Sequence, residues 1–260
     1  ALNWLSQGLS GVYITLELSE ELTSLRTDAM QTSMSTKDIR KDIDNTALKV
    51  RMASKKMGQY RVKALAAQSN VNDIRSYLKE VQIQTGIKVD FVMVDYLDLV
   101  MPVSVKVSPN DQFIKDKYVS EELRNLAQEL NIVLVTASQL NRSAVEEIEF
   151  DHSHIAGGIS KINTADNVFG IFTSRSMRER GKYQLQCMKS RSSTGVGQKI
   201  DLEYDINTMR ISDPDVDDTL SVASQAQPSA QALMDKFKTT SQVGQVDRAV
   251  QEQLEPPTKT

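Results

Sequence analysis

The chain has 260 residues, of which 40% are hydrophobic and 25% are charged, and its formal net charge is −3. This length is enough for one sizeable core with appendages, and the composition is that of a globular protein. The single cysteine, Cys187, excludes an internal disulfide framework and indicates a reducing compartment. No apolar stretch of roughly 18 residues and no signal-peptide pattern occurs, so we expect neither a membrane protein nor an exported one.

The charge is unevenly distributed along the chain. Residues 212–260 hold eight acidic and four basic side chains, which leaves residues 1–211 at about +1. A nearly neutral core neither demands nor excludes nucleic acid, because a ring can gather a few basic groups from each subunit in one channel. Residues 212–260 are also rich in Gln, Ser and Ala, which predicts a largely disordered acidic tail behind one domain, 1–211.

Five apolar or alternating runs predict strands, and helical patterns separate the first four of them. Runs without alternation are typical of strands buried on both faces of a parallel sheet. Strands that alternate with helices indicate the α/β class, with a mostly parallel sheet flanked by helices. The expected strands are Val12–Leu18, Tyr60–Ala64, Phe91–Val94, Ile132–Ala137 and Asn167–Phe172.

Helix ends are marked by residues that suit those positions. A side-chain oxygen at the N-cap accepts from free backbone N–H groups, and a glycine after the last turn adopts the left-handed conformation. The stretch 36–58 is helical by composition, but its side chains show no pattern typical of a catalytic or binding site. The expected N-caps are Ser19, Thr36, Asn45 and Asn70, the expected C-cap is Gly86, and Pro109 is expected at the first position of a helix that starts near Ser108 and Asp111.

Two further features lie in the second half of the chain. His152 and His154 stand two residues apart in a loop-like stretch, but histidines without a cysteine or a carboxylate set are more often surface residues than metal ligands. Alternating residues between 183 and 211 predict an antiparallel hairpin at the edge of the sheet. Its loop holds Lys189 and Arg191.

Polar side chains end three of the predicted parallel strands: Glu17, Asp95 and Gln139. Open α/β sheets bind ligands at the carboxyl ends of their strands, where a carboxylate can hold Mg²⁺ through its water shell. Hydrolysis of a nucleoside triphosphate needs one acid that orients water, one that holds the metal and a polar sensor of the γ-phosphate. The alternative is that all three cap helices, but Glu and Gln are poorer caps than Ser or Asp.

Several stretches resemble the hexameric replicative helicases of the DnaB type, and among these the helicases of T-even phages. YITLELSEE is similar to the strand with the catalytic glutamate, VDFVMVDYLDLV to the Walker B motif, and VTASQLNR to the third helicase motif. HIAGGISKINTADNVFGIF is similar to the segment with a DNA-facing loop, and CMKSRSSTG to the one with a trans-acting basic finger. The resemblance runs from Ala1 to about Ile211.

The resemblance implies a RecA-like core that uses ATP and Mg²⁺. It also implies a ring of six identical subunits that moves on single-stranded DNA in the cytoplasm, the host cytoplasm if a phage encodes the protein, with a primase and a helicase loader as further partners. By matching position, Glu17 would polarise the attacking water, Asp95 would hold Mg²⁺, and Gln139 would couple the γ-phosphate to DNA. Lys189 and Arg191 would reach the neighbouring subunit's site.

The segment matched to the DNA-facing loop departs from the family pattern. Bacterial members show Arg-Glu where this chain has Ala156-Gly157. Backbone groups and one lysine are then left for phosphate contact. The expected DNA-binding residues are Ala156, Gly157, Gly158 and Lys161.

A second departure is that no G-x-x-x-x-G-K-[ST] stretch occurs in the chain, so it has no P-loop to cradle phosphates. Either the chain is a fragment that begins after this motif, or it is a degenerate paralogue. The helix-like start at Ala1 and the lack of an initial Met favour the fragment, and we expect the chain alone not to hydrolyse ATP.

Two alternatives to the helicase stay open. One is an ATPase of the RecA or KaiC type with a role in recombination or regulation. The other is a non-catalytic assembly module, which the missing P-loop supports. The basic pair Lys189 and Arg191 favours the helicase, because a basic pair there can reach across a ring interface.

Overall fold

The computed structural model describes residues 1–108, 111–139 and 159–214 of the chain. One folded unit spans Ala1–Asp213 and contains two four-stranded sheets, one parallel and one antiparallel. In the described ranges, no helix has both the length and the apolar content needed to cross a bilayer. The α/β class predicted from the sequence is confirmed.

The parallel sheet has the strand order β2-β1-β3-β4. Its inner strands β1 and β3 are largely buried on both faces, as their unbroken apolar runs predict. β4 lies at the edge, and Val133 and Val135 on it are 53% and 40% exposed, so the prediction of a buried strand here is wrong. The strands are β1 (Gly11–Thr15), β2 (Tyr60–Ala64), β3 (Phe91–Asp95) and β4 (Val133–Thr136).

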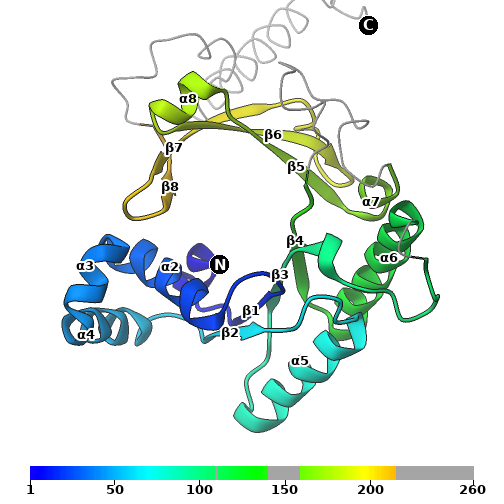
Figure 1. Cartoon of the computed structure of the whole chain (residues 1–260), viewed down its shortest axis with the longest axis horizontal. Helices are drawn as coiled ribbons and strands as arrows, with labels where there is room; N and C mark the ends of the chain where they lie inside the picture. Colours follow the sequence, from blue (N-terminus) through cyan, green and yellow to red (C-terminus); the bar gives the residue numbers. More distant parts are fainter. Residues whose placement is uncertain (109–110, 140–158, 215–260) are drawn as a thin grey trace, which may run out of the picture. The chain divides into compact units, whose positions relative to one another are not determined.

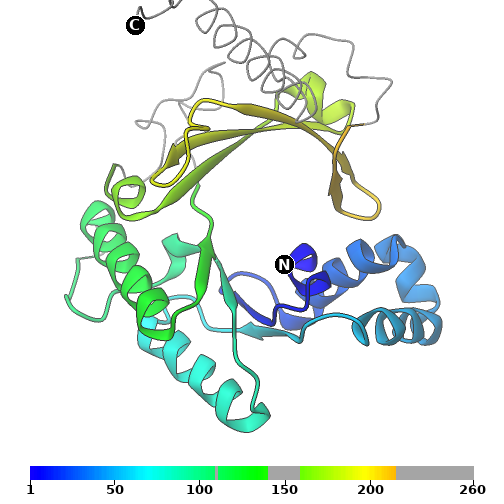
Figure 2. The same ribbon diagram turned by 180° about the vertical axis from the view of Figure 1, so that it is seen from behind.

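Helices α5 (Val71–Thr85) and α6 (Gln112–Leu130) lie side by side against the parallel sheet, as Figure 1 and the reverse view in Figure 2 both show. Apolar residues at helical spacing on both helices pack with those of β1 and β3, and each fully buried side chain contributes about 1.5–3 kcal/mol. The core they form includes Val12, Ile14, Ile74, Leu78, Val92, Val94, Leu123 and Leu126.

The ends of α5 follow from its local sequence. The Asn70 side chain accepts from the backbone N–H groups of Asn72 at 2.9 Å and Asp73 at 3.3 Å, and the Asp73 carboxylate accepts from the Asn70 N–H at 2.8 Å. This reciprocal pair is a capping box. Gly86 ends the helix in the left-handed region, with φ of 68°. Both predicted ends are confirmed.

Three helices follow β1 and stack beside one another (Figure 1, blue). Ser19 caps the first of them, as predicted. The other two predicted caps are wrong, because Ser35 and Asp42 accept the hydrogen bonds expected at Thr36 and Asn45. The helices are α2 (Glu20–Thr32), α3 (Thr36–Lys41) and α4 (Ile43–Ser54).

The predicted start of α6 is also wrong. Asp111 has φ of −99° and ψ of 56°, which is not helical, and the helix begins at Gln112 instead of Pro109. Pro109 itself lies outside the described residues. Before β1, the short helix α1 (Leu2–Ser6) places the ring of Trp4 at 5.0 Å from that of Phe91.

The antiparallel sheet has the order β5-β6-β7-β8. Strands β6 and β7 form the predicted hairpin, but they belong to this separate sheet instead of extending the parallel one. β6 also pairs with β5, so it is an inner strand, contrary to the prediction of an edge. The elements are α7 (Ile159–Thr164), β5 (Asn167–Phe172), α8 (Arg175–Glu179), β6 (Lys182–Ser190), β7 (Lys199–Asp205) and β8 (Arg210–Ser212).

Deleting residues 214–260 is expected to leave the melting temperature nearly unchanged. All buried apolar side chains among the described residues lie between Leu5 and Met188, and β8 ends at Ser212. Thermal unfolding of residues 1–213 and of the whole chain, followed by circular dichroism, tests this. A fall of many degrees would mean that the tail packs on the core, because each 1 kcal/mol corresponds to about 2–4 °C in a protein of this size.

Candidate functional site

The carboxyl ends of β1, β3 and β4 lie next to one another, because these strands are neighbours and run parallel. Asp95 is the last residue of β3, and Glu17 and Gln139 follow shortly after the ends of β1 and β4. The structure therefore brings the three side chains predicted from the sequence to the same edge of the sheet. Their chemical roles remain predictions.

β1 ends at Thr15, earlier than the predicted Leu18, because Thr15 turns the chain. Its buried hydroxyl accepts from the Leu18 N–H at 2.9 Å and lies 3.0 Å from the Leu18 carbonyl, to which it can donate. The next residue, Leu16, donates its N–H to the Asp95 carbonyl at 2.8 Å. Glu17 is thus exposed on a short turn that is fixed to the end of β3.

The Asp95 carboxylate is partly buried and held from one side. The phenol of Tyr13, on the neighbouring strand β1, donates to its Oδ2 at 2.7 Å. Burial, followed by this hydrogen bond to Asp95, raises the pKa of Tyr13 above its ordinary value, so the phenol stays protonated. No described residue donates a hydrogen bond to Oδ1 of Asp95.

The donor set fits a magnesium ion that keeps most of its water. Asp95 and Glu17 supply carboxylate oxygens, which hard cations prefer. Among the described residues, no group of three or more His, Cys, Asp or Glu side chains is arranged to hold a metal. A Mg²⁺ held by Asp95 would therefore share water and phosphate oxygens, as in nucleotide sites that use one or two carboxylates.

Tyr96 links Asp95, which precedes it in the chain, to Gln139. The sequence did not predict a role for it. Its phenol oxygen accepts from the Gln139 side-chain amide at 3.0 Å. Burial, and then the negative charges of Glu17, Asp98 and Asp95, raise the pKa of Tyr96. The Asp95–Tyr96 peptide bond is cis. An aromatic residue after a strand end has no pattern that marks it as functional, so only the fold reveals this link.

A cluster of buried charges joins this edge to α6 and α7. Asp116 is fully buried on the apolar face of α6, and the side chain of Lys161 in α7 is only 6% exposed. The Lys161 ammonium lies 2.8 Å from the Asp116 carboxylate and 2.9 Å from the Ser138 hydroxyl, and it pairs with Asp98 in the 3₁₀ helix η1 (Leu97–Leu99). A charged residue within the apolar stripe of α6 was the signal that could have identified the cluster.

The buried position of Lys161 does not suit the predicted contact with DNA. Its ammonium is enclosed by carboxylates, and a phosphate contact would require these ion pairs to open. The other residues predicted to face DNA (Ala156, Gly157 and Gly158) and the two histidines (His152 and His154) lie outside the described residues.

Lys189 and Arg191 lie at the end of β6 and bind the C-terminal turn of α7. Lys189 donates to carbonyl groups of Ile162 at 2.6 Å and Asn163 at 3.0 Å, and Arg191 donates to the Asn163 carbonyl at 2.8 Å. Positive side chains at the C-terminal carbonyls of a helix are favourable. Desolvation and the adjacent Arg191 charge lower the pKa of Lys189. Both residues were predicted to lie in the hairpin loop, but Lys189 belongs to β6 itself.

Asp166 forms ion pairs with two arginines of this region. Its carboxylate pairs with Arg191 at 2.9 Å and with Arg124 of α6 at 2.8 Å. The hydrogen bond from Arg124 is the main reason that the pKa of Asp166 lies below its usual range. Arg124 was not singled out from the sequence, where it is one of several charges on a long helix.

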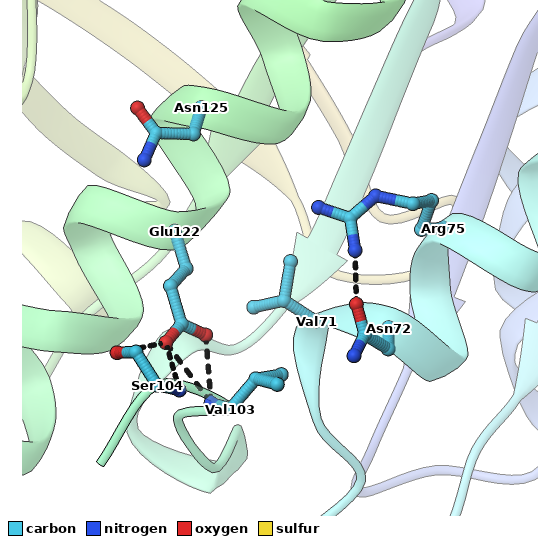
Figure 3. Close-up of a pocket in the computed structure, with 7 residues that line it drawn as sticks. All are labelled: Val71, Asn72, Arg75, Val103, Ser104, Glu122 and Asn125. Atoms are coloured by element: carbon cyan, nitrogen blue, oxygen red, sulfur yellow. Dashed lines mark hydrogen bonds between the residues drawn. The ribbon is translucent and has the colours of Figure 1, made fainter.

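Two cavities lie away from the strand ends. The smaller, of about 200 Å³, lies between α5 and α6 (Figure 3), where Glu122 accepts from the N–H groups of Val103 and Ser104 at 2.8–3.0 Å. The Glu122 carboxylate in this cavity therefore holds the loop at Val103 and Ser104 in place. The larger, of about 500 Å³, is lined mainly by α2, the end of α4 with the residues that follow it, and β2. Neither is lined by a residue predicted for the site.

Residues 3–213 match the family model of the DnaB-like helicase C-terminal domain. A DnaB-like replicative helicase of Enterobacteria phage T4 is 26% identical over 201 residues, which are 74% of this chain and 42% of that protein. The chain thus spans less than half of that relative.

Two solved structures share the fold, each with a TM-score of 0.65 and 20% identity over 80% of this chain. One is a DnaB-like replicative helicase described with its interactions with primase, of which 51% is covered. The other is an ATPase domain, of which 75% is covered. The predicted RecA-like architecture is confirmed by this likeness.

Proposed function

Since this chain belongs to the family of DnaB-like helicase C-terminal domains, we propose that it is the ATP-driven motor domain of a replicative DNA helicase. In this proposal six copies form a ring that moves on single-stranded DNA in the cytoplasm, using ATP and Mg²⁺. A primase and a helicase loader are the proposed partners. The observation that carries the proposal is the placement of Glu17, Asp95 and Gln139 on three adjacent strand ends.

Each side chain has a place that suits its proposed role. Glu17 is exposed on a turn tied to β3, so its carboxylate is available to orient the attacking water as a general base. Asp95 would hold the metal through its water shell, while Tyr13 donates to one of its carboxylate oxygens and so fixes its orientation. Bound Mg²⁺ would neutralise charge that develops on the phosphates. Gln139 reaches Tyr96 beside the two acids, and so can report on the γ-phosphate position.

Changing Glu17 to Gln is expected to lower ATP hydrolysis by about 10²–10⁴-fold, because the amide cannot take up a proton. The assay needs a form of the chain that also carries phosphate-binding groups. We define the P-loop form as this chain extended at its amino end by a strand and a G-x-x-x-x-G-K-[ST] loop leading into α1. Steady-state ATPase rates with and without single-stranded DNA give the measurement.

The matched control is Glu80→Gln, which neutralises an exposed glutamate on α5 away from the strand ends. It should hydrolyse ATP at the rate of the unchanged P-loop form. Nucleotide binding, measured separately, should be retained in both variants. Equal rates of hydrolysis for Glu17→Gln and the control would remove Glu17 from the proposed mechanism.

Unwinding of forked DNA by the P-loop form, with sedimentation to determine its assembly state, tests the function as a whole. ATP-dependent unwinding by a hexamer supports the helicase. Hydrolysis without unwinding would favour a RecA-type or KaiC-type ATPase of recombination or regulation. Rings without hydrolysis would favour a non-catalytic assembly module.

A further inference from the structure

We propose that Lys161 is a positioning residue that locks helix α7 to the strand ends of the candidate nucleotide site. This inference rests on the proposed function. α7 belongs to the stretch that is similar to the DNA-facing segment of the helicases. Lys161 connects this helix to Asp98 and Ser138, which lie close in the chain to the predicted site residues Asp95 and Gln139. Lys161 would then act by holding two parts of the motor in a fixed relation, without touching DNA phosphate.

The connection runs through Asp98 and Ser138. Lys161 pairs with Asp98, three residues after Asp95, and donates to the hydroxyl of Ser138, which precedes Gln139. Asp98 in turn accepts from the Gln139 backbone N–H at 3.3 Å and lies 3.4 Å from the Ser138 hydroxyl. A displacement of α7 therefore cannot leave the Asp98 and Gln139 contacts unchanged.

Burial makes these contacts selective for one arrangement. The side chains of Lys161, Asp98 and Asp116 are 6%, 10% and 0% exposed. Neither Asp116 oxygen accepts a well-oriented hydrogen bond from a described residue, so the nearby charges of Lys161 at 2.8 Å and Lys115 at 3.5 Å are what compensate its burial. Among the described residues, the positive charges of Lys115 and Lys161 balance the negative charges of Asp98 and Asp116. Removing one partner of a buried ion pair is strongly destabilising.

Stability alone does not account for such a cluster, because replacing a buried ion pair with apolar residues of similar size is often neutral or stabilising. What the charged pair adds is a defined position for α7 relative to η1 and the end of β4. A structural role and a positioning role can therefore be separated by a variant that keeps the fold and removes the link.

That variant combines Lys161→Met with Asp116→Leu, which removes one positive and one negative charge together and leaves Asp98 and Lys115. The matched control is Lys79→Met, which breaks an exposed ion pair with Glu129. Backbone hydrogen exchange of the 260-residue chain is measured by mass spectrometry with and without a single-stranded oligothymidine. In the unchanged chain and in the control, DNA should slow exchange in α7 and also at residues 95–99 and 137–139. The expected slowing is about fivefold or more, which is the lower end of the usual coupling between two sites.

In the double variant the slowing in α7 should persist while that at residues 95–99 and 137–139 is lost. Retention of the full response would overturn the positioning role and leave the proposed function intact. Loss of the α7 response as well would mean that Lys161 itself binds DNA, which also overturns it. No response to DNA in the unchanged chain would remove the DNA-motor function and this inference together. If the double variant does not fold, Asp98→Asn serves in its place, because it weakens the link while keeping Lys161. Loss of the response at residues 95–99 and 137–139 with the α7 response kept would support the positioning role, and retention of the full response or loss of the α7 response as well would overturn it.

Discussion

Replacing Arg191 with alanine is expected to lower ATP hydrolysis by rings of the P-loop form by a factor of about 10³–10⁵, the usual loss when an arginine finger is removed. The side chain is 47% exposed, yet its guanidinium is anchored by Asp166 at 2.9 Å and by the Asn163 carbonyl at 2.8 Å. An anchored cation at the end of a strand is suited to stabilise charge in a neighbour's transition state. Steady-state hydrolysis is the measurement.

The control for Arg191 is Arg175→Ala, which removes an exposed guanidinium whose partner is Glu179 in α8. It should leave hydrolysis unchanged. If Arg191 is only part of an exposed basic turn, its replacement will change stability by less than about 0.5 kcal/mol and activity hardly at all.

Mixed rings show whether Arg191 acts on the next subunit. Rings that contain both Arg191→Ala and Glu17→Gln subunits will include interfaces with an intact arginine facing an intact glutamate. Such rings should recover some activity that neither variant ring has alone. If rings shown to contain both subunits recover none, Arg191 works within its own subunit or does not contribute.

Replacing Lys161 alone with methionine is expected to lower the free energy of unfolding by about 3–5 kcal/mol, because it leaves buried carboxylates without their cation. Asp116 is fully buried, and among the described residues the ammonium of Lys115, at 3.5 Å, is then the remaining ion-pair partner of its carboxylate. Urea unfolding of the 260-residue chain, followed by circular dichroism, measures the change.

Adding Asp116→Leu to Lys161→Met should restore most of the lost stability, since the double change removes the uncompensated charge. Lys79→Met is again the control and should change the unfolding free energy by about 0.5 kcal/mol or less, as exposed ion pairs do. A loss below about 1 kcal/mol in Lys161→Met would mean that water reaches the cluster and solvates Asp116.

The features that the sequence predicts correctly are those decided by neighbours in the chain. The capping box of Asn70 and Asp73 needs only residues three apart, and the apolar run before Asp95 correctly predicts a strand. The common edge of Glu17, Asp95 and Gln139 follows from one rule about parallel strands. These predictions require no knowledge of which helix packs where.

The features that it misses depend on contacts between distant segments. Lys161 resembles a surface lysine until α6 and η1 enclose it, and Tyr96 gains its role from Gln139, which is 43 residues away. The exposure of Val133 and Val135 depends on what packs against that face of β4. The misplaced caps are a different error: Ser35 and Thr36 both carry a hydroxyl, and local preference does not separate adjacent residues.

The hydrogen bond between Tyr13 and Asp95 also bears on ion discrimination. Because Oδ2 already accepts from a phenol that stays protonated, Asp95 is better suited to hold a cation through Oδ1 alone than through both oxygens. Calcium takes six to eight ligands and often binds both oxygens of a carboxylate, whereas magnesium accepts single oxygens in a tight octahedron. The strand next to the proposed metal ligand thus biases the site toward the smaller ion through a residue that never contacts it.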